Sequence, residues 1–117
     1  MQGTINDKMQ GKVEKLFRSD SHSFSKYEEP RLTLVTAIGI EGDVHSGEFV
    51  KHRWDAERKP TEKNLRQVHL IAAEALAALK PLGFDVPAGA LGENISTSGL
   101  ELINLPLHSE LHIGERV

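Results

Sequence analysis

The chain has 117 residues, of which 38% are hydrophobic and 26% are charged, and its formal net charge is −3. This length predicts one domain, and this composition is typical of a soluble globular protein rather than a disordered one. The acidic balance disfavours a general nucleic-acid binder, and the complete lack of cysteine excludes disulfides and thiol catalysis from this chain.

The first half of the chain reads as short strands separated by polar loops. Residues 1–10 are polar and lack the apolar core of a signal peptide, so we expect a flexible N-terminus, a cytoplasmic protein and one domain over residues 11–117. Partial alternation predicts a strand over residues 11–19, and a Ser-, Asp- and Glu-rich loop follows over residues 19–30. Residues 31–38 are rich in Leu, Val and Thr and predict a second, more buried strand.

The clearest predicted helix spans residues 72–80. Alanine and leucine dominate there, Ala72, Ala75, Leu76 and Leu79 form one apolar stripe, and Pro81 and Gly83 stop the helix. Residues 65–71 alternate, and they form either a third strand or the first turn of this helix.

The last part of the chain adds weaker strand patterns. Residues 94–97 predict a short strand with Ile95 pointing inward, whereas residues 100–107 hold a proline and favour a turn or an edge. Residues 109–113 alternate again. The sum is a mainly β domain with helices (α+β), with a barrel-like or strongly bent sheet. No apolar run reaches the roughly 18 residues that a membrane span needs.

A glycine-rich segment, residues 39–47 (GIEGDVHSG), follows the second predicted strand. Glycine lets a ligand approach main-chain amides, and Asp43 and His45 have side chains that carry protons, bind metals and orient polar ligands. These two side chains either converge on a ligand or brace the loop, with Asp43 accepting backbone hydrogen bonds. They do not complete a coordination shell, so we predict no protein-only metal site.

Two further segments offer groups suited to an anion. Residues 51–66 hold six Lys/Arg and three acids, a local balance of +3, so the rest of the chain sums to −6. This segment is either a solvated loop or a basic region that attracts a small anion. It ends at Arg66, whose guanidinium suits phosphate or carboxylate. Residues 89–94 (GALGEN) either present amides to an anion or form a tight turn, with Glu93 and Asn94 bracing the other glycine loop.

In this order, the segments resemble the MOSC domain, named after the C-terminal domain of molybdenum cofactor sulfurase. The matching pieces are residues 39–47 (GIEGDVHSG), 66–71 (RQVHLI) with 74–76 (EAL), 89–95 (GALGENI) and 111–115 (LHIGE). Each piece is short, but four in series make a fairly specific signal, and the closest similarity is to the small bacterial stand-alone members.

The resemblance implies a fold, a cofactor and a set of binding residues. It implies a β-barrel of the pyruvate-kinase type, here incomplete at its C-terminus, and binding of the molybdenum cofactor (molybdopterin). Sulfur transfer or the reduction of N-hydroxylated compounds, with a redox partner protein, would follow, and pyridoxal phosphate binding is also implied. The cofactor-binding residues carried over by the resemblance are Gly42, Asp43, His45, Gly47, Arg66, Gln67, Gly92, Glu93 and Asn94.

The chain departs from the family in one important respect. The family's functional cysteine lies on a strand beyond the point that corresponds to Val117, and this chain has no cysteine. We expect a C-terminally truncated sequence, and the alternative is a natural short form that binds without catalysing. Open barrel edges invite pairing with another chain, so a homo-oligomer is expected.

Two other functions remain open at this point. One is a non-catalytic module that binds a phosphorylated small molecule. The other is a metal-dependent hydrolase that uses Asp43, His45 and His52. Neither function involves a membrane or a nucleic acid.

Overall fold

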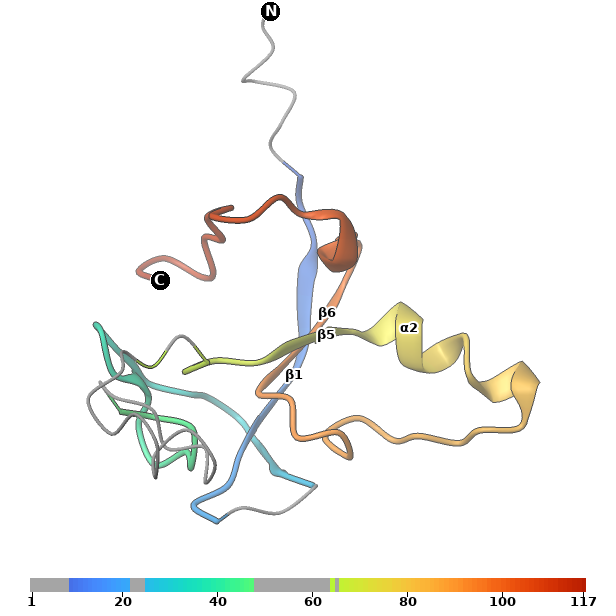
Figure 1. Ribbon diagram of the computed structural model, residues 1–117, viewed down its shortest axis with the longest axis horizontal. Helices are drawn as coiled ribbons and strands as arrows, with labels where there is room; N and C mark the ends of the chain where they lie inside the picture. Colours follow the sequence, from blue (N-terminus) through green and yellow to red (C-terminus); the bar gives the residue numbers. More distant parts are fainter. Residues whose placement is uncertain (1–8, 22–24, 48–63, 65) are drawn as a thin grey trace, which may run out of the picture.

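The structure is a computed structural model, and it describes residues 9–21, 25–47, 64 and 66–117. Its centre is a four-stranded sheet with strand order β2-β1-β6-β5, and a separate two-stranded sheet pairs β3 with β4 (Figure 1). The described chain is therefore an α+β fold built mostly from sheet with one short α-helix.

The two central strands of the larger sheet come from opposite ends of the chain. β1 (Lys12–Arg18) pairs antiparallel with β6 (Ile95–Ser98), with an irregularity between Val13 and Lys15. On its other side, β1 pairs antiparallel with β2 (Tyr27–Glu29), while β5 (Leu70–Ala72) runs parallel to β6. Both central strands agree with the sequence prediction, and Ile95 points inward as expected, being 1% exposed.

The predicted strand over residues 31–38 is wrong in its extent. The structure has a tight hairpin instead, with β3 (Leu34–Val35) paired to β4 (Gly39–Ile40). The backbone N–H of Ile38 donates to the carbonyl of Val35 at 3.0 Å, and this turn breaks the apolar run. The run is therefore folded back on itself, and Gly39 lies in a strand rather than opening the loop.

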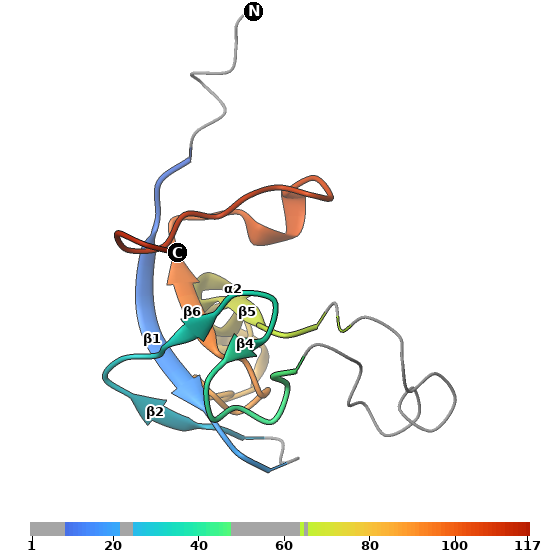
Figure 2. The same cartoon turned by 90° about the vertical axis from the view of Figure 1, so that its left-hand side faces the viewer.

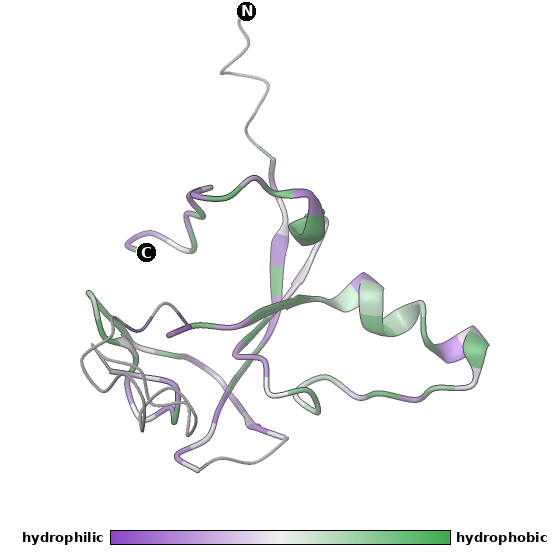
Figure 3. Ribbon diagram, viewed as in Figure 1, coloured by the Kyte–Doolittle hydropathy of each residue, from purple (hydrophilic) through white to green (hydrophobic). Residues whose placement is uncertain are grey.

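Two other predictions change in detail. The predicted loop over residues 19–30 contains β2, which pairs with the end of β1. The predicted helix over residues 72–80 is α2 (Ala73–Ala77) followed by the 3-10 turn η2 (Lys80–Leu82), and none of their residues is buried. Figure 3 shows in green that α2 is made mostly of apolar residues, and because none of them is buried, the apolar stripe is only partly covered.

The C-terminal part follows the expectation of a turn. A 3-10 turn, η3 (Leu102–Asn104), lies within residues 100–107. Residues 109–113 form no strand, so the alternation there does not predict the structure. Ile113 and Val117 instead exchange backbone hydrogen bonds across a turn.

No closed barrel is present among the described residues, because β2 and β5 are the edges of the sheet and do not pair with each other. Fully buried apolar side chains in this part of the chain are few, namely Phe17, Ile40 and Ile95. The hairpin lies at the end of the sheet where β1 ends and β5 begins (Figures 1 and 2). In the described part of the chain, no helix has the length and apolar character to cross a membrane.

Candidate functional site

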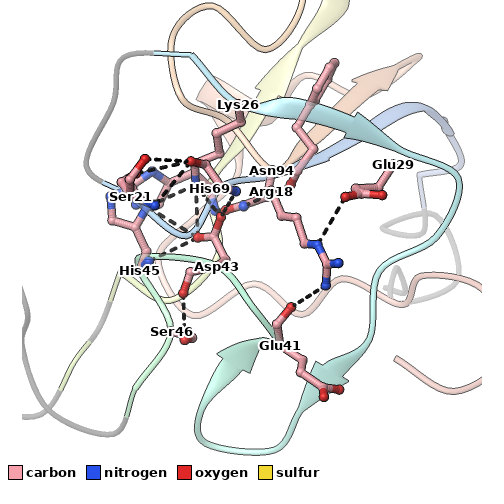
Figure 4. Close-up of polar contacts among 12 residues, drawn as sticks. Arg18, Ser21, Lys26, Glu29, Glu41, Asp43, His45, Ser46, His69 and Asn94 are labelled. Atoms are coloured by element: carbon pink, nitrogen blue, oxygen red, sulfur yellow. Dashed lines mark hydrogen bonds and ion pairs between the residues drawn. The ribbon is translucent and has the colours of Figure 1, made fainter.

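A buried ion pair lies between the end of the sheet and the hairpin. Lys26 Nζ is 3.0 Å from each carboxylate oxygen of Asp43, and both side chains are completely covered (Figure 4). Burying two charges is costly unless they are paired and hydrogen-bonded, so a pair with this geometry holds its surroundings in one arrangement.

Backbone contacts bring the two partners together. The N–H of Lys26 donates to the carbonyl of Gly89 at 3.0 Å, which ties the start of β2 to the turn before β6. Asp43 sits in the turn after β4, where its own N–H donates to the carbonyl of Ile40. The next residue, Val44, donates to the carbonyl of Ser19 at 2.6 Å and fixes the turn against the end of β1.

Asp43 is held as a carboxylate. Burial on its own raises the pKa of Asp43, but the backbone N–H of Ser19, the ammonium of Lys26 and the backbone N–H of His45 together hold this pKa below its usual value. The two N–H groups lie 3.0 and 3.1 Å from the carboxylate oxygens. The loop-bracing role considered from sequence is therefore confirmed for Asp43.

Two histidines lie against this ion pair. The Nδ1 atom of His45 is 3.1 Å from Lys26 Nζ and 3.5 Å from the Oδ2 atom of Asp43. The rings of His45 and His69 stack with centroids 4.3 Å apart and planes tilted by 32°. Of the His45 side chain, 17% is exposed, so this ring reaches from the covered ion pair toward the surface.

Asn94 joins the second glycine segment, residues 89–94, to the same cluster. Its Oδ1 atom accepts a hydrogen bond from the backbone N–H of His69 at 3.0 Å, and its Nδ2 donates to the carbonyl of Phe17 at 3.2 Å. Asn94 is 0% exposed. The three motif segments, 39–47, 66–71 and 89–95, thus meet at one place.

Gly47 and Gln67 act as braces of this cluster. The side-chain Nε2 of Gln67 donates to the carbonyls of Ala37 and Gly47, at 2.6 and 3.0 Å. Asn64 adds hydrogen bonds from its side-chain Nδ2 to the carbonyls of His45 and Gly47, at 2.8 and 3.0 Å. These bonds hold the glycine segment against the residues that lead through His69 into β5.

The remaining predicted residues surround the cluster without joining the ion pair. Gly42 is exposed with a φ of 83°, and a Cβ there would lie 2.9 Å from Nη1 of Arg18. The Gly92 N–H closes a turn by donating to the Gly89 carbonyl. Glu93 is buried, its Oε2 accepts from the Gly89 N–H at 2.8 Å, and its Oε1 has no hydrogen-bond partner. Arg66 is exposed.

Lys26 is the residue of this site that the sequence prediction misses. It stands in a segment of Ser, Glu and Tyr that reads as a solvated loop, and no local pattern marks it as buried. His52 and the basic segment up to Lys63 lie outside the described residues.

The described residues contain no group of three His, Cys, Asp or Glu side chains that could hold a metal ion. Both oxygens of Asp43 already bind Lys26 and backbone N–H groups, which leaves that carboxylate unsuited to ligate a cation. A hollow of about 480 Å³ opens at the other end of β1, between Lys12 and Ser98, and it is separate from the cluster.

Comparison with known proteins gives one structural likeness. No protein-family model matches the chain, and no curated protein matches it. The chain is similar to the crystal structure of the YUAD protein from Bacillus subtilis, with a TM-score of 0.63 and 26% sequence identity. The match covers 78% of this chain and 52% of the YUAD chain, so this chain spans about half the length of that protein.

Proposed function

We propose that this chain forms one wall of a MOSC-type site that binds the molybdenum cofactor. The observation that carries the proposal is the convergence of the three motif segments on His45, His69 and Asn94. The same proposal assigns the open sheet to a barrel of the pyruvate-kinase type, whose further strands would pair with the edges of β2 and β5.

The described residues suit the organic part of this cofactor rather than its metal. The stacked rings of His45 and His69 bring aromatic surface to the place where the motif segments meet, and aromatic surface suits a planar pterin. The exposed guanidinium of Arg66 starts the segment that carries His69 and suits a phosphate group. No cysteine is available as a molybdenum ligand or sulfur carrier.

The chain's own residues would bind and orient. The Lys26–Asp43 pair holds the ring of His45, and Asn94 holds the backbone of His69, so both rings are positioned before a ligand arrives. When bound, the cofactor supplies the redox or sulfur-transfer chemistry, and a redox partner protein belongs to this proposal.

The two alternatives differ in what they bind. A non-catalytic module for a phosphorylated small molecule uses the same donors and predicts affinity without turnover. A hydrolase built on Asp43, His45 and His52 requires a bound metal, and the contacts of Asp43 with Lys26 and with Ser19 count against it.

A retention assay separates these functions. The purified chain is incubated without oxygen with molybdenum cofactor released from a molybdoenzyme, or with pyridoxal phosphate, and then gel-filtered. Retained pterin and molybdenum support the proposal, whereas retained pyridoxal phosphate with no pterin supports the binding module. Retention of neither ligand contradicts both. Stoichiometric zinc, manganese or iron in the purified protein would support the hydrolase.

A matched pair of arginine variants tests the assigned wall. Arg66→Ala should weaken pterin retention about tenfold, which corresponds to about 1.4 kcal/mol, within the range of a charge-assisted hydrogen bond. The control is Arg116→Ala, because Arg116 is also exposed but lies in the C-terminal segment. Equal losses in the two variants would show that Arg66 acts only through net charge.

A further inference from the structure

We propose that the hollow at the start of β1 is a further binding site, and that it takes a small zwitterion of the amino-acid class. The hollow has a volume of about 480 Å³ and lies between the start of β1 and the end of β6, away from the His45 cluster. It shares no residue with the proposed cofactor site, so the inference does not rest on the proposed function. The residues that line it are Gln10, Gly11, Lys12, Glu14, Ser98 and Gly99.

The backbone of two strands shapes this hollow. Lys12 and Ser98 are directly opposite each other in the β1–β6 ladder, so their side chains rise from the same face of the sheet. Next to them the chains approach closely, because a Cβ on Gly11 would lie 2.5 Å from the carbonyl oxygen of Ser98 and one on Gly99 would lie 3.4 Å from Cα of Gly11. Neither glycine has a side chain that could fill the hollow.

A β-bulge places an acidic residue in the same lining. The register between β1 and β6 shifts between Val13 and Lys15, so Glu14 is an extra residue without a partner on β6. Bulges re-aim a side chain, and they are over-represented beside active sites. Here the bulged residue lines the hollow together with Lys12, and the two carry opposite charges.

These two charges have no partner in the described part of the chain. The other cations of β1, Lys15 and Arg18, each form an ion pair with a glutamate of β2. Lys12 and Glu14 form no ion pair or side-chain hydrogen bond with each other or with any other described residue, and the Ser98 hydroxyl forms none either. A cation, an anion and a hydroxyl therefore face one hollow and are available to a ligand.

The spacing of the charges matches a ligand that carries both signs. A strand rises about 3.3 Å per residue, so positions 12 and 14 are about 7 Å apart. An amino acid has its carboxylate and ammonium groups on one carbon, and with a hydrogen bond of about 2.8 Å at each end it can bridge this spacing. Lys12 and Ser98 would donate to the carboxylate, and Glu14 would accept from the ammonium. A simple anion or cation would satisfy only one end.

The turn beside the hollow is fixed from outside. The backbone N–H of Gly99 donates to Oε2 of Glu74, in the first turn of α2, at 2.6 Å. This N–H is therefore occupied and does not serve the ligand. The carboxylate of the ligand consequently depends on Lys12 and Ser98 alone.

NMR titration of the ¹⁵N-labelled protein with three matched compounds tests the ligand class. L-Alanine carries both charges, N-acetyl-L-alanine keeps only the carboxylate, and L-alaninamide keeps only the ammonium group. L-Alanine should shift the backbone amide signals of Lys12, Glu14 and Ser98 in a saturable way, with a dissociation constant of about 1 mM, and each of the other compounds should bind at least about tenfold more weakly.

Three results of these titrations would overturn the proposal. One is the lack of saturable shifts at these amides with up to about 50 mM L-alanine. A second is equal affinity for L-alanine and N-acetyl-L-alanine, which would indicate a plain anion site. The third is a set of shifts confined to the His45 cluster, which would place the binding elsewhere.

Variants of the two charged residues test the assignment. Lys12→Met and Glu14→Gln should each weaken the binding of L-alanine about tenfold, because each removes one charge-assisted hydrogen bond. The matched controls are Lys15→Met and Glu28→Gln, which remove similar charges from an exposed pair near the same strand. The controls should leave the affinity unchanged, and equal losses in the controls and the test variants would contradict the site.

Discussion

Replacing Lys26 by methionine should cost the protein a large part of its stability. The substitution leaves the carboxylate of Asp43 buried without its counter-ion, and removing one partner of a buried ion pair costs about 3–5 kcal/mol. Asp43 keeps two backbone N–H donors, from Ser19 and His45, so the lower end of this range, about 3 kcal/mol, is expected. Domains of this kind are stable by about 5–15 kcal/mol in total.

Urea denaturation followed by circular dichroism measures this loss. With a slope of about 1.5 kcal/mol per molar, the midpoint should fall by about 2 M. The matched control is Lys15→Met, because Lys15 pairs with Glu28 at 3.8 Å with both side chains more than half exposed. Surface pairs of this kind contribute about 0–1 kcal/mol, so the control should barely shift the midpoint.

A double-mutant cycle decides whether the pair is the cause. Lys26→Met combined with Asp43→Asn removes both charges, and the double variant should be more stable than the sum of the two single losses predicts. Additive losses, or a loss in Lys26→Met no larger than in the Lys15 control, would refute the reasoning.

Three further predictions concern neighbouring features of the fold. Because the folded state lowers the pKa of Asp43, this carboxylate contributes its full stabilisation above the ordinary pKa of 3.8, and the stabilisation is lost as the pH falls through the lower folded-state pKa. In Asp43→Asn, the urea midpoint should therefore fall less steeply with decreasing pH than in the wild type. The same pH profile in both proteins would contradict this prediction. Gly89→Ala should cost about 3 kcal/mol of stability, because φ is 87° there and the new Cβ would lie 2.9 Å from the Phe17 ring. The control Gly83→Ala should cost about 1 kcal/mol, because its φ of 92° is similar but the space around it is open. Equal shifts in melting temperature would show that the contact with Phe17 contributes nothing to the loss. Asn94→Ala should cost about 2–4 kcal/mol, because it removes the hydrogen bonds from a fully buried side chain to the backbone of His69 and Phe17. The exposed Asn104→Ala should change the stability by less than about 0.5 kcal/mol, and similar unfolding midpoints for the two variants would contradict the bracing role of Asn94.

Local pattern predicts the strands that lie at the centre of the sheet. The alternation over residues 11–19 and the apolar Ile95 identify β1 and β6, because each strand has one face covered. The glycine segment 39–47 is likewise visible from its residue types, and Asp43 does brace its loop. Periodicity and turn chemistry are local properties of the sequence, so they predict these elements without knowledge of the segments that pack against them.

Elements that depend on a partner were not predictable in the same way. β2 has the sequence Tyr-Glu-Glu, which has little strand preference, and it exists because the end of β1 offers an unpaired edge. The hairpin of β3 and β4 interrupts a run that reads as one continuous strand. The burial of Lys26 depends on a carboxylate 17 residues away, so only the folded chain reveals it.

Asn94 also has a consequence for the order in which the molecule assembles. Its side chain ties residues 77 and 25 positions earlier in the chain, so it closes two loops at once. Contacts of such long range form late in folding, because the entropy of loop closure comes before the gain. The cluster around the histidines therefore cannot pre-exist in a partly folded chain, and it forms together with the central strands. The amide hydrogen of His69, which donates to Asn94, should accordingly exchange with solvent mainly through global unfolding.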